Sequence, residues 1–298
     1  MFVRSIISPN RQMISQFALF LKSFVKNSRL TDYSINLTVG PESCPGIKRL
    51  QKICGDRLSL NQYTTSDYGF DPPYLGGIQR WQVNGPHDVS LFIDADVLVC
   101  GSLCEVEISC RETQCVHGVA NIGSPFRFSD TDSRIMWNKI AKVFQMDFKF
   151  IKHLGVGIHR EFGHVDRHFH IPENYLNYGF VLVPEKHRLL LCEVLPEFVA
   201  KSVEVYGTNF WNGEIALCAA MNKYAIPVKL LDLKYNYPDR QEFFDRMPSP
   251  DIRILHMVKK KIRDHDDAVN ALYKIKSDSA CDSLISSSIR DLFRKMVI

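Results

Sequence analysis

Residues 89–99 read VSLFIDADVLV, a nearly continuous apolar run that contains two aspartates. Such a run is typical of a central strand that is covered on both faces. Side chains two apart in a strand point to the same side, so we expect Asp94 and Asp96 to converge on one ligand. An unpaired buried carboxylate is costly, and a divalent cation with its preference for oxygen ligands would relieve the repulsion. The alternative is a pair of surface or turn aspartates without a ligand.

The residues before this run predict a parallel sheet. Residues 2–7 form a short, partly apolar run that ends at the turn Ser8-Pro9-Asn10, which is typical of a first strand. Residues 12–26 repeat apolar side chains at intervals of three and four, which predicts an amphipathic helix. Residues 33–39 alternate apolar and polar side chains, as a second strand would. This order is typical of an α/β protein, in which ligands bind beyond the carboxyl ends of the strands.

The later part of the chain continues the alternation. The predicted helices cover residues 133–149, 186–205 and 213–222, and the predicted strands cover residues 178–184, 227–233 and 252–258. Residues 40–75 show no clear pattern, and residues 153–173, which contain five histidines, are predicted to be irregular. No repeat, low-complexity tract or linker divides the chain. We therefore expect a single domain.

Length, charge and cysteine content limit the function classes. The chain has 298 residues, of which 45% are hydrophobic and 23% charged, enough to bury a substantial core. A net charge of +4 suits anionic ligands such as phosphates and is too small for a general nucleic-acid-binding protein. Nine scattered cysteines predict mostly buried, reduced thiols of an intracellular protein. The four cysteines between residues 100 and 115 lack the paired spacing of a structural zinc site.

The N-terminal sequence shows no targeting signal. MFVRSIISPN lacks the apolar core and the small-residue cleavage site of a signal peptide. The apolar stretch at residues 17–25 is interrupted by Lys22 and is too short to span a bilayer. We therefore expect a cytoplasmic protein without a transmembrane segment. The basic residues 259–263 leave peripheral attachment to an anionic membrane as an alternative.

Five sequence blocks carry a resemblance to a known group of enzymes. The blocks are, in order, LFIDADVLVCGSL, YLNYGFVLVP, WNGEIAL, KYNY and ILHM. Their order resembles the signature of GT-A-fold glycosyltransferases, and it is most similar to the retaining group that includes glycogenin and bacterial lipopolysaccharide galactosyltransferases. The resemblance implies an α/β, Rossmann-like fold with a mostly parallel central sheet flanked by helices. It also implies a catalytic domain at residues 1–262, with residues 263–298 as a helical tail packed on it.

The resemblance implies a metal-dependent hexosyltransferase. The donor would be a nucleotide sugar, with UDP-glucose, UDP-galactose and UDP-N-acetylglucosamine all compatible, and transfer would retain the configuration. The acceptor is unknown and would be a glycan, a lipid-linked glycan or a protein, with residues 153–170 shaping its side of the site. No nucleic-acid partner is implied.

The implied metal is Mn²⁺ or Mg²⁺. Asp96 would bind it directly, Asp94 would be shared between the metal and the ribose, and His256 would be the third protein ligand. A neutral imidazole beside two carboxylates suits manganese better than magnesium. The alternative for His256 is a histidine with ordinary partners at a strand end.

The resemblance also implies contacts with the donor at Ser8, Arg80, Gly179 and Lys261. Arg80 would reach the diphosphate, for which a bidentate guanidinium is suited, or it is an ordinary surface arginine. Gly179 would let the backbone approach the sugar closely. Lys261 would bind phosphate from a shifted loop, since the usual lysine position holds Ile262; a solvated run of charges is the alternative.

The implied catalytic residues are Asn177, Asn212 and Glu214. Asn177 would belong to an Asn-x-Gly turn near the sugar, or it simply begins a strand. The block Asn212-Gly213-Glu214 replaces the usual Asp-Gln-Asp, which leaves Glu214 as its only carboxylate. Glu214 would bind sugar hydroxyls or stabilise positive charge at the anomeric carbon, or it merely favours a helix N-terminus.

Two other functions remain open from the sequence. The altered block at residues 212–214 is compatible with a catalytically inactive nucleotide-binding protein of the same fold. A haloacid-dehalogenase-type phosphatase also uses a hydrophobic-Asp-x-Asp motif, but there the motif normally opens the domain, whereas here it begins at Asp94. The second aspartate is followed by Val97 and Leu98 where that class has residues like Gly and Thr.

Overall fold

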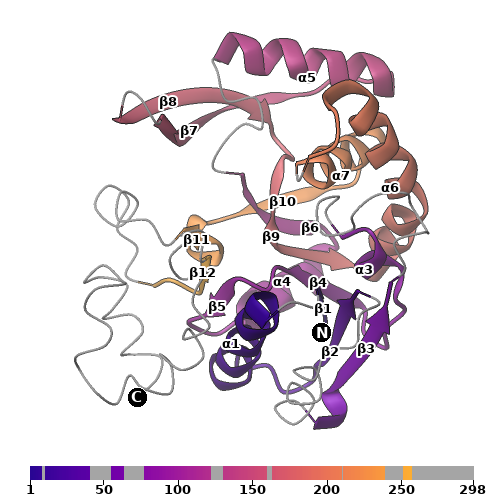
Figure 1. Ribbon diagram of the computed structural model, residues 1–298, viewed down its shortest axis with the longest axis vertical. Coiled ribbons are helices and arrows are strands. Elements are labelled where there is room, and N and C mark those ends of the chain that lie inside the picture. Colours follow the sequence, from indigo (N-terminus) through magenta and orange to yellow (C-terminus); the bar gives the residue numbers. More distant parts are fainter. Residues whose placement is uncertain are drawn as a thin grey trace.

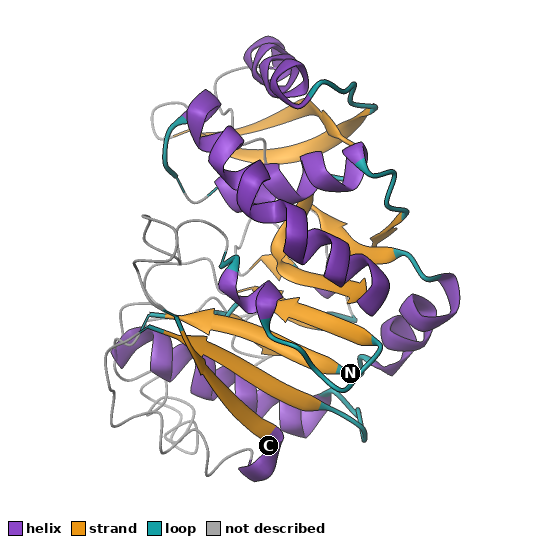
Figure 2. Cartoon of the chain, turned by 90° about the vertical axis from the view of Figure 1, so that its right-hand side faces the viewer, coloured by secondary structure: helices purple, strands orange, loops and turns teal. Residues whose placement is uncertain are grey.

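A seven-stranded sheet forms the centre of the molecule (Figures 1 and 2). The computed structural model describes residues 1–8, 11–40, 55–63, 77–121, 130–159, 163–209, 211–238 and 251–256. The strand order is β10-β6-β9-β4-β1-β2-β3. The strands are β1 (Phe2–Ile7), β2 (Ser34–Val39), β3 (Leu58–Gln62), β4 (Val89–Ile93), β6 (Val116–Ala120), β9 (Leu176–Pro184) and β10 (Val228–Leu231).

The sheet is mostly parallel, as predicted. Only β9 runs antiparallel to its neighbours β4 and β6, and every other neighbouring pair in this sheet is parallel. The parallel pair β1–β2 follows from the strand-helix-strand order of residues 2–39, because a parallel connection needs a crossover. The resulting α/β sheet confirms the predicted fold class.

Helices cover both faces of the sheet (Figure 2), and two hydrophobic clusters result. Helices α1 (Arg11–Asn27) and α4 (Cys104–Thr113) contribute to the first cluster, together with Leu91 and Ile93 of β4. Helices α6 (Glu185–Tyr206) and α7 (Asn212–Lys223) contribute to the second, together with Phe92. Alternate residues of β4 therefore face opposite layers, which explains why its sequence is apolar throughout.

The predicted single strand over residues 89–99 is wrong. β4 ends at Ile93, residues 94–96 form a turn, and β5 (Val97–Val99) joins a smaller sheet with β12 (Ile254–His256) and β11 (Tyr237–Pro238). The break has a physical reason, since a strand buried on both faces would hold carboxylates away from water at high cost. The turn lets Asp94 and Asp96 leave the apolar layers.

The prediction of an irregular segment at residues 153–173 is also wrong. β7 (Phe150–His159) and β8 (Gly163–Pro172) pair as an antiparallel hairpin. Helix α5 (Asp130–Phe144) lies beside this hairpin, at the top of Figure 1. The two strands satisfy each other's backbone groups, so the hairpin does not need the regular apolar alternation that signals a strand in a sheet.

The remaining predicted elements are confirmed within a few residues wherever the structure describes them. Helix α3 (Gln79–Gln82) is an addition that the sequence did not signal. In the described part of the chain, none of the helices has the length and apolar character needed to cross a bilayer. The predicted tail at residues 263–298 lies outside the described residues.

Candidate active site

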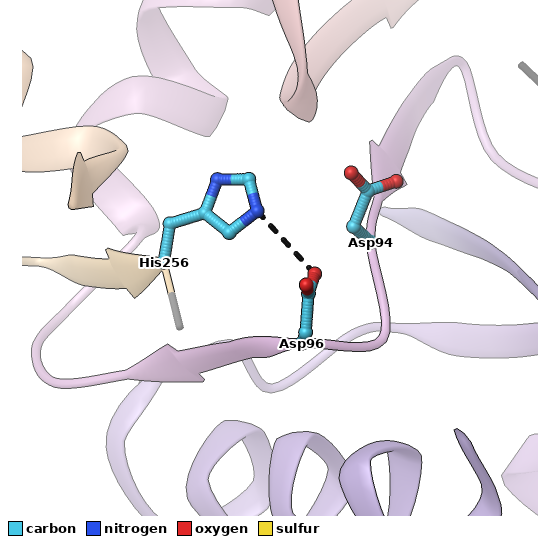
Figure 3. A group of neighbouring side chains, drawn as sticks. All are labelled: Asp94, Asp96 and His256. Atoms are coloured by element: carbon cyan, nitrogen blue, oxygen red, sulfur yellow. Dashed lines mark ion pairs between the residues drawn. The ribbon is translucent and has the colours of Figure 1, made fainter. Parts of the chain in front are cut away.

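Three side chains from two segments far apart in the sequence meet beyond the end of β4 (Figure 3). Asp94 directly follows β4, Asp96 directly precedes β5, and His256 ends β12. One ligand atom from each lies within 4.8 Å of the others. The His256 Nε2 atom lies 3.3 Å from Asp96 Oδ1. The structure thus brings together the residues that were predicted to hold a metal.

The pairing of the small sheet explains how His256 reaches the aspartates. β12 runs antiparallel to β5, and His256 is in register with Val97, the neighbour of Asp96. The Asp94 side chain is 36% exposed, that of Asp96 17% and that of His256 11%. The carboxylates are therefore partly open to solvent, whereas the imidazole is almost enclosed. Two carboxylate oxygens and one imidazole nitrogen are a donor set that fits Mn²⁺ and is compatible with Mg²⁺.

Arg80 lies behind Asp94. Its side chain is only 1% exposed, and Nη1 lies 3.4 Å from Asp94 Oδ1 and 3.3 Å from the carbonyl oxygen of Ile93. The guanidinium also lies over the Tyr178 ring, with Cζ 5.1 Å from the ring centroid. In this position Arg80 orients Asp94. Its contact with a diphosphate stays a prediction, and such burial leaves Arg80 to act on a ligand through Asp94.

Asn177 and Gly179 lie against His256 rather than apart from the metal cluster. Asn177 Oδ1 accepts hydrogen bonds from the Gly179 amide at 2.8 Å and from Asn236 Nδ2 at 2.7 Å. A Cβ atom on Gly179 would lie 2.8 Å from Cε1 and Nδ1 of His256. The close approach that requires a glycine here is the approach of the imidazole. Contact of either residue with a sugar stays a prediction.

Glu214 is buried in the first turn of α7. Its Oε2 atom accepts hydrogen bonds from Asn121 Nδ2 at 2.7 Å and from the Tyr175 hydroxyl at 3.0 Å, and Oε1 accepts one from the Tyr178 amide at 3.3 Å. Burial is the main cause that raises the pKa of Glu214 to about 8, with a smaller contribution from the charge of Asp94 and with the donated hydrogen bonds opposing the rise. The carboxyl group is therefore mostly protonated near neutral pH.

Asn121, Tyr175 and Asn236 were not predicted from the sequence. Asn121 directly follows β6, and a polar residue after the carboxyl end of a sheet strand was the signal available for it. Tyr175 and Asn236 fall within the sequence blocks YLNYGFVLVP and KYNY, which carried no assignment for them.

Two other predicted residues, Asn212 and Ser8, make different contacts in the described structure. Asn212 is buried, and its side chain pairs with Ser202 Oγ and the Asn209 amide, which ties α7 to α6 and to the preceding loop. Ser8 follows β1, where its amide lies 3.3 Å from Met13 Sδ. Lys261 lies outside the described residues, as do the side chains of most of the histidine-rich hairpin.

Comparisons with known proteins give a fold and no close relative. No protein-family profile matches the sequence, and no curated protein matches it. The galactosyltransferase LgtC, solved with donor and acceptor sugar analogues, is similar with a TM-score of 0.60 and 12% identity over 98% of this chain and 100% of that chain. The bifunctional glycosyltransferase WbbM has a TM-score of 0.56 and 16% identity over 87% of this chain and 45% of its own.

A mouse protein, xyloside xylosyltransferase 1, is also similar, with a TM-score of 0.51 and 11% identity over 86% of this chain and 96% of that chain. These neighbours are GT-A folds. The predicted GT-A fold of this chain is therefore confirmed. At such low sequence identity the likeness concerns the fold alone.

Proposed function

We propose that this chain is a glycosyltransferase that moves a hexose from a UDP sugar to an acceptor and depends on Mn²⁺ or Mg²⁺. The observation that carries the proposal is the group of Asp94, Asp96 and His256 at the carboxyl end of β4 in a GT-A fold. The LgtC structure with donor and acceptor sugar analogues supports a sugar-transfer reaction on this fold.

The residues of the cluster would hold the cation and the donor. Asp96 and His256 would be direct ligands, and Asp94 would be shared with the ribose. A bound divalent cation would supply Lewis-acid stabilisation of the negative charge that grows on the leaving diphosphate. Arg80 would keep Asp94 in its orientation, and Ser8 and Lys261 would add contacts to the donor. The preference for manganese rests on the imidazole nitrogen in the donor set.

The surroundings of Glu214 support transfer without a protein nucleophile. Both carboxyl oxygens of Glu214 accept hydrogen bonds from the protein, and Gly213 offers no side chain. We infer that the acceptor attacks on the face from which the diphosphate leaves, with retention of configuration, while the sugar is oxocarbenium-like. Glu214, mostly neutral near neutral pH, would bind sugar hydroxyls together with Asn177.

The acceptor side of the site is proposed to involve the hairpin of β7 and β8, because this hairpin stands outside the seven-stranded sheet and segments carried by such a scaffold often determine specificity. The acceptor would be a glycan, a lipid-linked glycan or a protein. The proposed location is the cytoplasm, with the basic residues 259–263 as a contact to an anionic membrane surface.

The test is UDP release from a panel of UDP sugars, with Mn²⁺ or with a chelator. We expect slow hydrolysis of one donor, lost with the chelator and in Asp96→Asn. Asp88→Asn is the matched control, because Asp88 is an exposed aspartate that pairs with Arg111 at the start of β4. A protein that releases UDP equally well with the chelator would contradict the metal dependence, and inversion at the anomeric carbon would contradict retention.

A catalytically inactive nucleotide-binding protein is the second candidate. The observation that favours it is the engagement of Asn212 in hydrogen bonds with Ser202 and Asn209, which leaves Glu214 as the only side chain of that block near the cluster. A Mn²⁺-dependent rise in melting temperature with UDP, without turnover of any donor or acceptor, would support this candidate. Hydrolysis of a simple aryl phosphate, with no response to UDP, would instead support the phosphatase.

A further inference from the structure

A chain of polar groups connects the backbone of β9 to the metal cluster. The Gly179 amide donates to Asn177 Oδ1 at 2.8 Å, and Asn236 Nδ2 donates to the same oxygen at 2.7 Å. Asn236 Oδ1 then lies 3.0 Å from His256 Nδ1. The other ring nitrogen of His256 lies 3.3 Å from Asp96 Oδ1. This series of polar contacts thus ends at His256 Nε2, the ring nitrogen that faces the aspartates.

The direction of every hydrogen bond in this series follows from the first one, which the Gly179 amide donates. A backbone amide can only donate, so the Asn177 atom beside it must be the carbonyl oxygen. That oxygen can only accept, so the Asn236 atom beside it must be the amide nitrogen. The opposite side of Asn236 therefore presents its oxygen to His256, and Nδ1 of the imidazole must carry a proton. In the neutral imidazole, Nε2 then has the free electron pair that a metal needs.

The burial of Asn236 shows that its orientation is held by the fold. Asn236 is buried in the turn between the 3-10 helix η4 (Leu233–Tyr235) and β11, and its amide donates to the Leu233 carbonyl at 2.9 Å. Its side chain joins Asn177 of β9 to His256 of β12, which are 79 positions apart in the sequence. The imidazole also packs so closely on the backbone of β9 that a Cβ atom on Gly179 would lie 2.8 Å from its Cε1 and Nδ1 atoms.

We propose that Asn236 is a positioning residue of the metal site, which holds His256 in the tautomer and ring orientation that present Nε2 to a cation bound by Asp94 and Asp96. The inference rests on the metal dependence proposed above. Partners of this kind are common for metal-binding histidines, which usually hydrogen-bond through the second ring nitrogen. Asn236 itself has no need to touch the substrate or the cation.

The test compares Asn236→Leu, which removes both hydrogen bonds, with Asn236→Asp, which keeps an acceptor for His256 Nδ1. Asn36→Leu is the matched control, because Asn36 is also buried and bridges a donor and an acceptor, Thr38 and Ser59, in another part of the sheet. Mn²⁺ affinity in the presence of UDP is measured from the electron paramagnetic resonance of free Mn²⁺. We expect Asn236→Leu to lose about 10- to 100-fold in affinity, and Asn236→Asp and Asn36→Leu to change much less.

A second readout reports the tautomer without any metal. Ring ¹⁵N chemical shifts of histidine-labelled, metal-free protein distinguish Nδ1–H from Nε2–H, and His256→Gln identifies the resonance. For the neutral imidazole we expect Nδ1–H in the wild type and in Asn236→Asp, and a mixture of tautomers in Asn236→Leu.

The outcomes separate this inference from the proposed function. If the wild type does not bind Mn²⁺ with UDP, both are overturned. If the wild type binds Mn²⁺ and Asn236→Leu keeps the wild-type affinity or the wild-type tautomer, only the role of Asn236 is overturned. Equal losses in Asn236→Leu and Asn36→Leu would assign the effect to the loss of buried hydrogen bonds in general, and would overturn that role as well.

Discussion

Asp96 and Glu214 are acidic side chains in neighbouring parts of one site, and their surroundings differ in kind. Glu214 is enclosed and accepts hydrogen bonds from Asn121, Tyr175 and the Tyr178 amide, all of them neutral donors. Asp96 is partly open, with His256 beside it and the carboxylate of Asp94 close by. Burial raises the pKa of Glu214 to about 8, so its charge is neutralised by a proton.

The difference shows how one fold can favour a protonated carboxyl group at one position and ionised carboxylates at another. An enclosed carboxyl group with neutral donors is best stabilised by binding a proton, because desolvation penalises its charged form. Two partly exposed carboxylates that face each other are best stabilised by a shared cation, because water and the cation together offset their repulsion. Glu214 is accordingly a candidate for sugar contacts, and the aspartates are candidates for metal ligands.

The largest expected effect is a difference in Mn²⁺ affinity between substitutions of Asp96 and of Glu214. We expect Asp96→Asn to weaken Mn²⁺ binding in the presence of UDP by more than the roughly 10- to 100-fold that is typical of losing an outer partner of a metal ligand. We expect Glu214→Gln to change it by less than about threefold at neutral pH, because Glu214 is already mostly uncharged there. The measurement is the same electron paramagnetic resonance titration. Equal losses in both variants would contradict the contrast between the two environments.

The next effect concerns the pH dependence of stability. The folded protein holds the Glu214 proton with a pKa of about 8, compared with the ordinary value of 4.5. The stabilisation by this proton is complete below the ordinary value and is lost as the pH rises through about 8, because the unfolded chain binds fewer protons over that range. We expect the free energy of unfolding of the wild type to fall by a few kcal/mol relative to Glu214→Gln between about pH 5 and pH 9.

Urea unfolding at several pH values measures this difference. Glu197→Gln is the control, because Glu197 is an exposed residue of α6 that pairs with Lys201, and it should keep the pH dependence of the wild type. If the free energy of unfolding of the wild type and of Glu214→Gln changed identically with pH, Glu214 would be ionised in the folded protein over this pH range.

A smaller effect tests the close packing of the His256 imidazole against Gly179. The Cβ atom of Gly179→Ala would lie 2.8 Å from the imidazole and from Asn177 Oδ1, so we expect a loss of about 1–3 kcal/mol in stability from overpacking and weaker Mn²⁺ binding. Gly118→Ala is the control, since its Cβ would meet the flexible end of Leu176 at 2.8 Å, away from the cluster. Both variants are followed by urea unfolding and Mn²⁺ titration. Unchanged Mn²⁺ affinity in Gly179→Ala would show that Mn²⁺ binding does not depend on the close packing of the imidazole against Gly179.

The smallest effect concerns the donors around Glu214. Asn121→Ala removes a buried hydrogen bond of 2.7 Å to Glu214 Oε2, and we expect a loss of about 1–2 kcal/mol in stability. Asn222→Ala removes an exposed hydrogen bond to the Asp147 carbonyl and should cost less. Urea unfolding of both variants gives the comparison. A larger loss in Asn222→Ala would contradict the view that neutral donors support the enclosed carboxyl group.

Local sequence patterns were sufficient to predict those elements whose pattern lies within one short segment. The apolar repeat at residues 12–26 predicted α1, and the ordered strands and helix at residues 2–39 predicted the parallel sheet. The paired aspartates pointed to a metal because two carboxylates in an apolar run need a partner. The pattern nevertheless misplaced them in one long strand, because the pairing of β5 with β12 depends on residues far along the chain.

The sequence alone predicted an α/β fold and the residue types of a candidate metal site, because apolar periodicity and carboxylates within an apolar run are properties of short segments. The tertiary structure decided which polar groups face one another. Arg80 lies next to Asp94, Asn212 pairs with Ser202 of α6, and the Asn236 side-chain oxygen lies 3.0 Å from His256 Nδ1. These contacts join residues that are 10 to 20 positions apart, and their geometry arises only when the fold brings the segments together.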